Sequence, residues 1–176
     1  GLYYRCYYQI TLANDFIRQS ADATVASKGI TGVDAEAIKK YRAEARFLRA
    51  YQYSILMDLF GNIPFVTDAE ALGSVLPKQR TRGEIFSYIE TELKAIESTL
   101  VDARKNEYGR ADKAAAWALL ARLYLNAQVY TGTARNTDAA TYAKRVLDAG
   151  YSLITDYTKL MRADNNVNTS EFILTI

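Results

Sequence analysis

The clearest indication of the fold class comes from residues 112–125, which read DKAAAWALLARLYL. Alanine and leucine dominate this stretch, and both favour an α-helix. On a helix the apolar side chains would cover nearly the whole circumference, so they do not form a single stripe. A helix that is apolar on all sides is buried between neighbours. The sequence therefore predicts a buried helix that begins near Asp112 and packs among other helices.

This predicted helix contains the spacing Trp117-x-x-Leu120-Ala121-x-x-Tyr124. The same spacing is typical of the first helix of a tetratricopeptide repeat, with alanine here in place of the usual glycine. A small residue lets the paired helix approach closely, while the larger neighbours fill the groove. An ordinary helical hairpin with a buried tryptophan would use these residues in the same way. In both cases we expect Trp117 to lie in the core.

A shorter helix predicted at residues 138–149 would be the second helix of the hairpin, and Gly150 is well placed to end it. Within it, Ala143 and Leu147 stand four residues apart, as the small and large positions of the second repeat helix do. An unbroken repeat would place the small residue ten positions earlier. Residues 131–137 are therefore predicted to be an insertion.

Apolar periodicity predicts three further helices in the first hundred residues. They run from about Leu2 to Val25, from an N-cap at Asp34 to Gly61, and from the capping box Thr81–Glu84 to about Leu100. A long connection covers residues 62–80, and the tail ends in a predicted short strand at residues 172–176. The predicted fold class is all-α, with tetratricopeptide-like helical hairpins and a short irregular or β-like C-terminal tail. Residues 1–176 are expected to be a single helical fragment of a larger protein.

Composition excludes several classes of function. The 176 residues include no histidine, which removes Ser-His-Asp and Cys-His catalysis and histidine metal ligation. Cys6 is the one cysteine, so neither an intrachain disulfide nor a thiolate zinc site can form. The 22 basic and 20 acidic side chains leave a formal charge of +2, which disfavours nucleic acid as a partner. No run of about 18 apolar residues predicts a membrane-spanning helix.

Tyrosine is abundant, with fourteen in the chain. A tyrosine ring can stack on the apolar face of a sugar while its hydroxyl forms hydrogen bonds. Most of these tyrosines, however, fall at the spacing of a helical core, where the ring is buried and the hydroxyl stays near water. For Tyr3, Tyr4, Tyr7 and Tyr8 we favour a place in the core or in an interface over a glycan site.

Glu44, Arg46 and Arg49 are the most distinctive charged residues. Arg46 and Arg49 share one face of the predicted helix, and an arginine fork can bind a carboxylate or a backbone carbonyl between packed helices. We interpret them as a structural bracket that holds the loop near Phe60 and Gly61. This interpretation is favoured over a ligand clamp.

Two sets of oxygen-bearing side chains are interpreted as structural. Residues 164–168 resemble the start of a calcium loop, but Thr169 and Thr175 replace the glycine and glutamate that such a loop needs, so a turn is favoured. Glu90, Glu92 and Glu97 are expected to solvate the polar face of their helix. The sequence thus predicts no catalytic residue, no cofactor-binding residue and no metal ligand, and therefore no cofactor.

Three longer stretches resemble the SusD/RagB family of outer-membrane nutrient-binding lipoproteins. They are AEARFLRAYQY at 43–53 with LFGNIPF at 59–65, GRADKAA at 109–115 with LARLYLNA at 120–127, and YAKRVL at 142–147 with Gly150, Tyr151 and EFIL at 171–174. Their order and spacing agree with the family, and the sequences at 109–115 and 124–132 are similar to those of its starch-binding branch.

This resemblance implies a non-catalytic glycan-binding protein at the surface of the outer membrane. Its partner would be a SusC-type TonB-dependent transporter, through which captured oligosaccharide or polysaccharide is imported, and a lipid anchor outside this chain would provide the contact with the membrane. Family members bind sugars chiefly through loops before and after the portion present here. The glycan-contact residues and the glycan itself are therefore unknown, and the chain would be mainly scaffold.

Two other functions are compatible with a helical-repeat chain. A generic tetratricopeptide adaptor would bind protein segments in a concave groove. A helical glycoside hydrolase would instead cleave its glycan. The SusD-like interpretation is favoured over both, because the resemblance extends over most of the chain from Glu36 onward.

Overall fold

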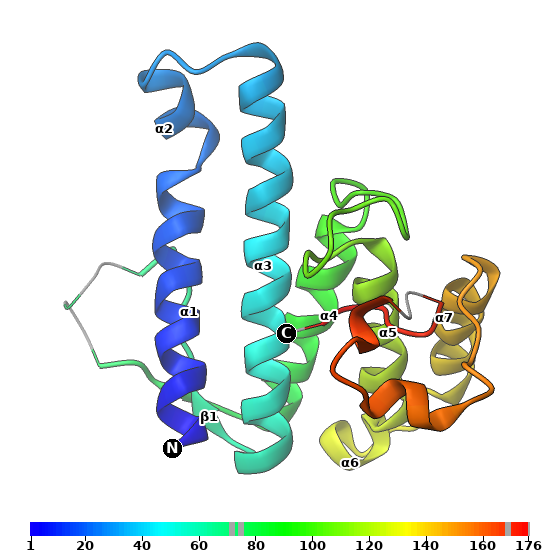
Figure 1. Ribbon diagram of the computed structural model, residues 1–176. Helices are drawn as coiled ribbons and strands as arrows, with labels where there is room; N and C mark the ends of the chain where they lie inside the picture. Colours follow the sequence, from blue (N-terminus) through cyan, green and yellow to red (C-terminus); the bar gives the residue numbers. More distant parts are fainter. Residues whose placement is uncertain (71–72, 74–75, 168–169, 176) are drawn as a thin grey trace.

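Long α-helices that alternate in direction make up most of the protein (Figure 1). The computed structural model describes residues 1–70, 73, 76–167 and 170–175. The helices are α1 (Leu2–Gln19), α2 (Asp22–Ser27), α3 (Gly32–Phe60), α4 (Arg82–Ile96), α5 (Lys113–Leu125), α6 (Ala127–Thr131) and α7 (Asn136–Asp148). The 3₁₀ helices η1 (Tyr157–Met161) and η2 (Asn165–Val167) follow in the tail. The all-α fold class is confirmed.

A break divides the first predicted helix. The sequence predicted one helix from Leu2 to Val25, but α1 ends at Gln19 and α2 begins at Asp22. Ala21 between them has an extended backbone, with φ −58° and ψ 144°. Arg42 of α3 binds this break, because its guanidinium donates to the Ser20 carbonyl and to the Asp22 carboxylate, the latter at 2.8 Å. The break is thus stabilised by a tertiary contact that periodicity does not reveal.

The ends of α3 test two sequence predictions. Its start was predicted at an Asp34 N-cap, which is wrong: α3 begins at Gly32, Thr31 is the N-cap, and Asp34 lies in the first turn. An acidic residue there still stabilises the positive end of the helix dipole. The predicted end is confirmed, since Gly61 follows the last residue with φ +74°, a conformation that favours glycine.

Side-chain caps begin α4 and α5. The predicted capping box is present, because the Glu84 amide donates to Thr81 Oγ1 (3.3 Å) and the Thr81 amide donates to Glu84 Oε2 (2.8 Å). At α5, Oδ1 of Asp112 accepts from the Ala115 amide (3.1 Å), so the predicted start near Asp112 is confirmed. Leu100 belonged to the predicted helix but lies beyond the end of α4, where it is still buried.

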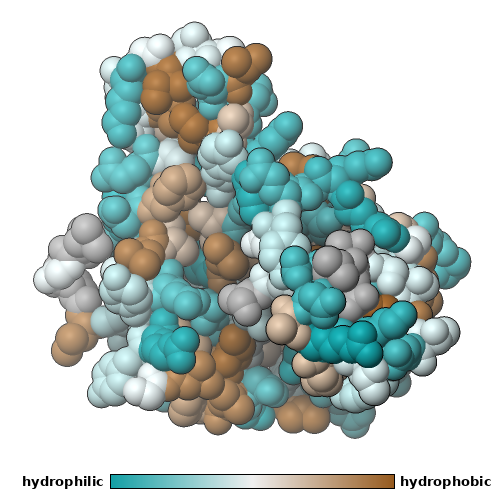
Figure 2. Space-filling view, viewed as in Figure 1, coloured by the Kyte–Doolittle hydropathy of each residue, from teal (hydrophilic) through white to brown (hydrophobic). Residues whose placement is uncertain are grey.

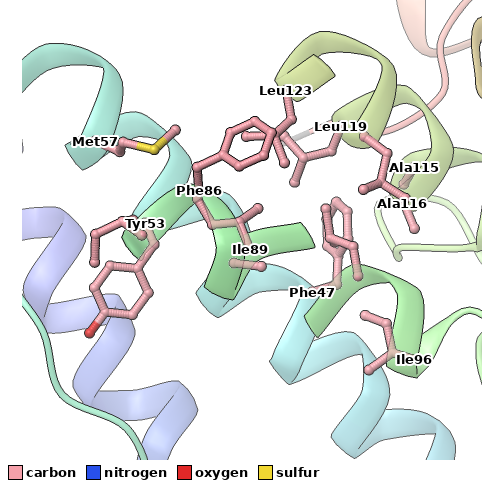
Figure 3. Packing of buried hydrophobic residues seen from close by; sticks show 14 of the residues in the cluster. Phe47, Tyr53, Met57, Phe86, Ile89, Ile96, Ala115, Ala116, Leu119 and Leu123 are labelled. Atoms are coloured by element: carbon pink, nitrogen blue, oxygen red, sulfur yellow. The ribbon is translucent and has the colours of Figure 1, made fainter. Parts of the chain in front are cut away.

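The core lies between α3, α4 and α5. Side chains from these three helices point toward one another in Figure 3, and Phe47, Ile89 and Leu120 are among the members that are almost fully buried. α5 buries residues on all sides, as predicted: Ala114, Ala115, Ala116, Leu119, Leu120, Leu123 and Tyr124. α1 packs on the other side of α3, and α7 packs on α5.

The hairpin of α5 and α7 forms, but its predicted register is wrong. Ala143 and Leu147 were expected to face α5, and both are exposed, Leu147 by 66%. The buried face of α7 instead contains Ala139, Tyr142 and Val146. A helical turn that the repeat pattern does not include, α6, lies between the two helices in the chain and packs against α4.

The segments outside the helices also differ from prediction. No strand forms in the described tail residues 172–175, and Ile176 lies outside the described residues. Ile173 and Leu174 instead pack against the core. A short antiparallel pair of β1 (Ile63–Pro64) and β2 (Gln79–Arg80) closes the connection after α3, with Ile63 opposite Arg80. The sequence had indicated only a loop there.

Leu93 and Leu147 offer a matched test of the core. Leu93 of α4 has no exposed surface, so Leu93→Ala should lower the free energy of unfolding by about 2–5 kcal/mol through lost burial and a residual cavity. Leu147→Ala makes the same chemical change at an exposed site of α7, and it should shift stability by at most about 0.5 kcal/mol. Urea unfolding followed by circular dichroism measures both. Equal effects would contradict the assigned core.

Candidate functional site

A buried arginine joins three helices and the connection that follows α3. Arg49 of α3 is 3% exposed, and its Nη1 donates to Asn14 Oδ1 of α1 (2.7 Å) and to Asp68 Oδ1 (2.5 Å). Its Nη2 donates to Glu92 Oε2 of α4 (3.0 Å). A buried guanidinium needs such partners because its charge is costly to remove from water. We call Arg49 with Asn14, Asp68, Glu92 and Arg46 the arginine cluster.

Arg46 completes this cluster through a bidentate ion pair. Its Nε and Nη2 donate to Glu92 Oε2 (3.0 Å) and Oε1 (2.7 Å). Burial alone would raise the pKa of Glu92, but the hydrogen bonds and charges of Arg46 and Arg49 outweigh burial and hold that pKa below its ordinary value. The prediction that Glu92 solvates a polar helix face is therefore wrong. Its partners come from another helix, which the spacing along α4 does not reveal.

Arg46 and Arg49 have the structural role that was predicted, but they do not bind the predicted segment. The two arginines were expected to hold the loop near Phe60 and Gly61. Arg49 instead binds Asp68, further along the connection. The neighbouring carbonyl of Val66 accepts hydrogen bonds from Tyr53 (2.6 Å) and Asn14 (3.3 Å). The first part of the connection is thus fastened across α1 and α3.

Glu90 of α4 also bridges helices, contrary to prediction. Its Oε1 accepts from Tyr124 of α5 (2.7 Å), from Arg135 next to α7 (3.3 Å) and from Lys94 (2.6 Å). Arg135 also lies over the Tyr124 ring, 4.6 Å from its centroid. Burial would raise the pKa of Glu90, but these donors hold it below its ordinary value.

Trp117 of α5 is less buried than predicted. Its side chain packs against the core but remains partly exposed. Its Nε1 donates to Oε1 of Glu97, the residue directly after α4 (2.9 Å), and the same oxygen accepts from Arg145 of α7 (2.8 Å). Glu97 therefore joins α4, α5 and α7, and its predicted role as a solvating side chain is wrong.

The loop at residues 102–112 is held from several sides. Glu44 of α3 forms a bidentate pair with Arg110 (3.0 and 2.7 Å) and accepts from Asn106 (3.2 Å). On the side that faces α3, Arg110 lies over the Tyr41 ring, 4.7 Å from its centroid. Figure 2 shows a notch in the surface between the tall α1–α3 pair and the rest of the protein.

On its other side this loop borders a cleft of about 290 Å³. The tail after α7 forms the opposite wall, and the lining includes Arg104, Tyr108, Tyr151, Asn166 and Phe172. We call it the tyrosine cleft. Apolar periodicity does not indicate that these residues meet, because they lie in a loop and a tail rather than on one helix.

The tyrosines at the start of α1 divide into two pairs. Tyr3 and Tyr7 are partly buried: the Tyr3 ring packs edge-on against Phe60 (5.2 Å between centroids), and the Tyr7 hydroxyl donates to the Pro64 carbonyl (2.7 Å). Tyr4 and Tyr8 are exposed by 77% and 66% and do not belong to the core. Their place in an interface stays a prediction.

Tyr4 and Tyr8 continue as an exposed row on α1. Leu12 and Phe16 follow at the same four-residue spacing and are exposed by 53% and 42%. Residues four apart lie on one face of a helix, so the four form a continuous strip, which we call the α1 row. Other apolar side chains are exposed at the start of α1 and the end of α3, the lower end of this pair in Figure 2.

The described residues contain no group of three or more aspartate, glutamate or cysteine side chains placed to hold a metal ion. In the calcium-like segment, the described residues Asn165–Val167 form the short helix η2, and the Asn165 side chain donates to the Leu160 carbonyl (2.9 Å). Asn168 and Thr169 lie outside the described residues. No helix within the described part is long and apolar enough to cross a membrane.

Alternating helices packed as tetratricopeptide-like hairpins, and joined by ion pairs between helices, define an all-α, tetratricopeptide-like fold. Residues 1–125 match the SusD-like family model described as "Starch-binding associating with outer membrane". The chain belongs to this family, which confirms the resemblance found in the sequence.

Individual relatives agree with this assignment. The chain is 43% identical over 178 residues to the starch-binding protein SusD of Bacteroides thetaiotaomicron, covering 99% of this chain and 30% of that protein. It superimposes on a laminarin-binding SusD-like protein with a TM-score of 0.80 and 26% identity, covering 98% of this chain and 36% of the other. A structure solved with a xylogluco-oligosaccharide superimposes with a TM-score of 0.79 and 27% identity. This match covers 99% of this chain and 34% of the other. The chain thus spans about a third of the length of these relatives.

Glu92→Gln tests the arginine cluster. Removing the carboxylate leaves two guanidinium groups without their shared partner, so the free energy of unfolding should fall by about 3 kcal/mol at pH 7. Because the pKa of Glu92 is lowered in the folded protein, its stabilisation is present above the ordinary glutamate pKa of about 4.3 and is lost as pH falls through the folded value. The variant should therefore lose less stability than the wild type on acidification. Urea unfolding between pH 3 and 7 measures both effects.

Asp148→Asn is the matched control. It removes the carboxylate of an exposed pair with Lys144 on α7 and should cost at most about 0.5 kcal/mol. Equal losses of unfolding free energy in the two variants would contradict the role assigned to the cluster. The same holds if Glu92→Gln loses as much stability on acidification as the wild type does.

Proposed function

We propose that this chain is the helical scaffold of a longer, non-catalytic protein that captures glycans at the surface of the outer membrane. The observation that carries the proposal is the family match over residues 1–125. Relatives described as starch-binding and laminarin-binding support a glycan as ligand. Capture also fits the arginine cluster, since helices fastened by buried ion pairs suit a rigid support.

The proposed partner is a SusC-type TonB-dependent transporter that imports the captured oligosaccharide or polysaccharide. Weak sugar binding would then be reinforced by proximity to the pore. We assign docking on this partner to the α1 row, because an exposed apolar strip of this kind is typical of an interaction surface. A lipid anchor outside this chain would hold the assembly at the membrane. Family membership favours this function over a generic tetratricopeptide adaptor.

We propose that residues of the longer protein, outside these 176, determine which glycan is bound. The intact lipoprotein should be retarded by at least one neutral polysaccharide when it migrates through gels that contain starch, laminarin or xyloglucan. Incubation with the same glycans should release no new reducing ends, because the protein is proposed to bind and not to cleave. Migration unaffected by all three would contradict glycan capture, and new reducing ends would contradict the non-catalytic assignment.

A double variant, Tyr4→Ser with Tyr8→Ser, tests the α1 row. Both side chains are largely exposed, so the protein should keep its melting temperature while recovery of the transporter with the tagged lipoprotein from detergent extracts falls severalfold. Tyr157→Ser removes a tyrosine of similar exposure (68%) from the tail and should leave recovery unchanged. Full recovery with the double variant would exclude the α1 row as the docking surface.

A further inference from the structure

The loop that borders the tyrosine cleft is held in one shape before any ligand binds. The Arg104 amide donates to Asp112 Oδ2 (2.7 Å), and Arg104 has φ +62°, a left-handed conformation that is costly for a residue with a Cβ atom. Asn106 donates to the Ala111 carbonyl (2.8 Å), and Arg110 is paired with Glu44. A strained backbone persists where its surroundings determine it, and such places cluster at ligand sites.

This rigid loop presents an aromatic side chain beside the cleft. Tyr108 is 65% exposed and lies outside any helix or strand. Its ring is therefore not needed for the packing of a secondary-structure element. Tyr151 and Phe172 line the same cleft from the tail. The Arg104 guanidinium lies 5.2 Å from the centroid of the Tyr151 ring and donates to the Gly150 carbonyl, which fixes this side of the cleft to the loop.

Hydrogen-bonding groups stand among these rings. Within the described residues the Tyr151 hydroxyl has no hydrogen-bond partner, although its ring is partly buried. A tyrosine hydroxyl is protonated at neutral pH and can donate; burial, and next the charge of Asp112, raise the pKa of Tyr151 further, to about 12. Asn166 adds an amide, which can both donate and accept.

The basic and acidic side chains that line the cleft are equal in number: Arg104 and Arg110 face Glu107 and Asp112. Arg110 is paired with Glu44 and, at 3.5 Å, with Glu107, whereas the Arg104 guanidinium contacts the Tyr151 ring and the Gly150 carbonyl. The lining therefore has no excess of one sign of charge that would select an anion or a cation. A neutral ligand with many hydroxyl groups and apolar C–H faces fits this combination of rings, amide and hydroxyl.

We propose that the tyrosine cleft is an auxiliary subsite for a short stretch of a neutral oligosaccharide. Tyr108 stacks on a sugar face, and the Tyr151 hydroxyl and the Asn166 amide bond its hydroxyl groups. A volume of about 290 Å³ lies at the lower end of ligand pockets and suits one or two sugar rings. The ligand class rests on the proposed function, whereas the location rests on the cleft itself.

The test is a nuclear magnetic resonance titration of the 176-residue chain with maltotriose and, separately, with laminaritriose. Amide shifts should change at residues 104–112 and around Tyr151 and Phe172, with a dissociation constant in the millimolar range. Tyr108→Ala should weaken binding about fivefold through loss of stacking, and Tyr151→Phe should weaken it severalfold while it keeps the ring. Tyr157→Ala, at an exposed tail position outside the cleft lining, should bind as the wild type does.

Three outcomes would overturn the subsite. These are the absence of shift changes with both trisaccharides, unchanged affinity in Tyr108→Ala, and an equal loss in Tyr157→Ala. None of them bears on glycan capture by the intact lipoprotein, which the polysaccharide gels test on their own. Conversely, trisaccharide binding at the cleft would stand even if the intact protein passed through those gels without retardation.

Discussion

The buried charge of Arg49 is the constraint on which the packing of the N-terminal half depends. A guanidinium with 3% exposure must be surrounded by acceptors, and these come from α1, from the connection after α3, and from α4. Apolar packing alone would tolerate small slides of one helix along another. Directional bonds to Asn14, Asp68 and Glu92 set both the register of these helices and the path of the connection.

The same device recurs further along the chain. Glu90 of α4 and Glu97, the residue directly after it, accept hydrogen bonds from α5, from α7 and from Arg135 beside α7. They therefore bond the α4 segment to both of these helices. These contacts lie between helices and leave the α1 row and the tyrosine cleft open. The α1 row lies on a helix that Arg49 bonds through Asn14, and the cleft borders a loop that Glu44 bonds through Arg110. This division between a fastened interior and open outer surfaces suits a scaffold that binds other molecules.

Helix positions and caps could largely be predicted from sequence, because they depend on residues close to one another in the chain. The Thr81–Glu84 capping box and the all-round apolar character of α5 were both read correctly. The errors concern contacts between distant segments. Glu92 looks like a surface residue on α4 until Arg46 and Arg49 are placed beside it. Ala143 has a suitable spacing but lies on the exposed face of α7, because this helix buries Ala139, Tyr142 and Val146 instead.

The sequence by itself determined the helical class, the main helix boundaries and, through its family-like stretches, the kind of protein. These follow from local propensity and spacing, which act within a few residues. Only the tertiary structure decided which charges are buried together and which tyrosines are left facing solvent. Tyr7 and Tyr8 are neighbours in the chain, yet one is bonded to Pro64 and the other is 66% exposed. The difference arises because a side chain's surroundings are supplied by segments far away in sequence.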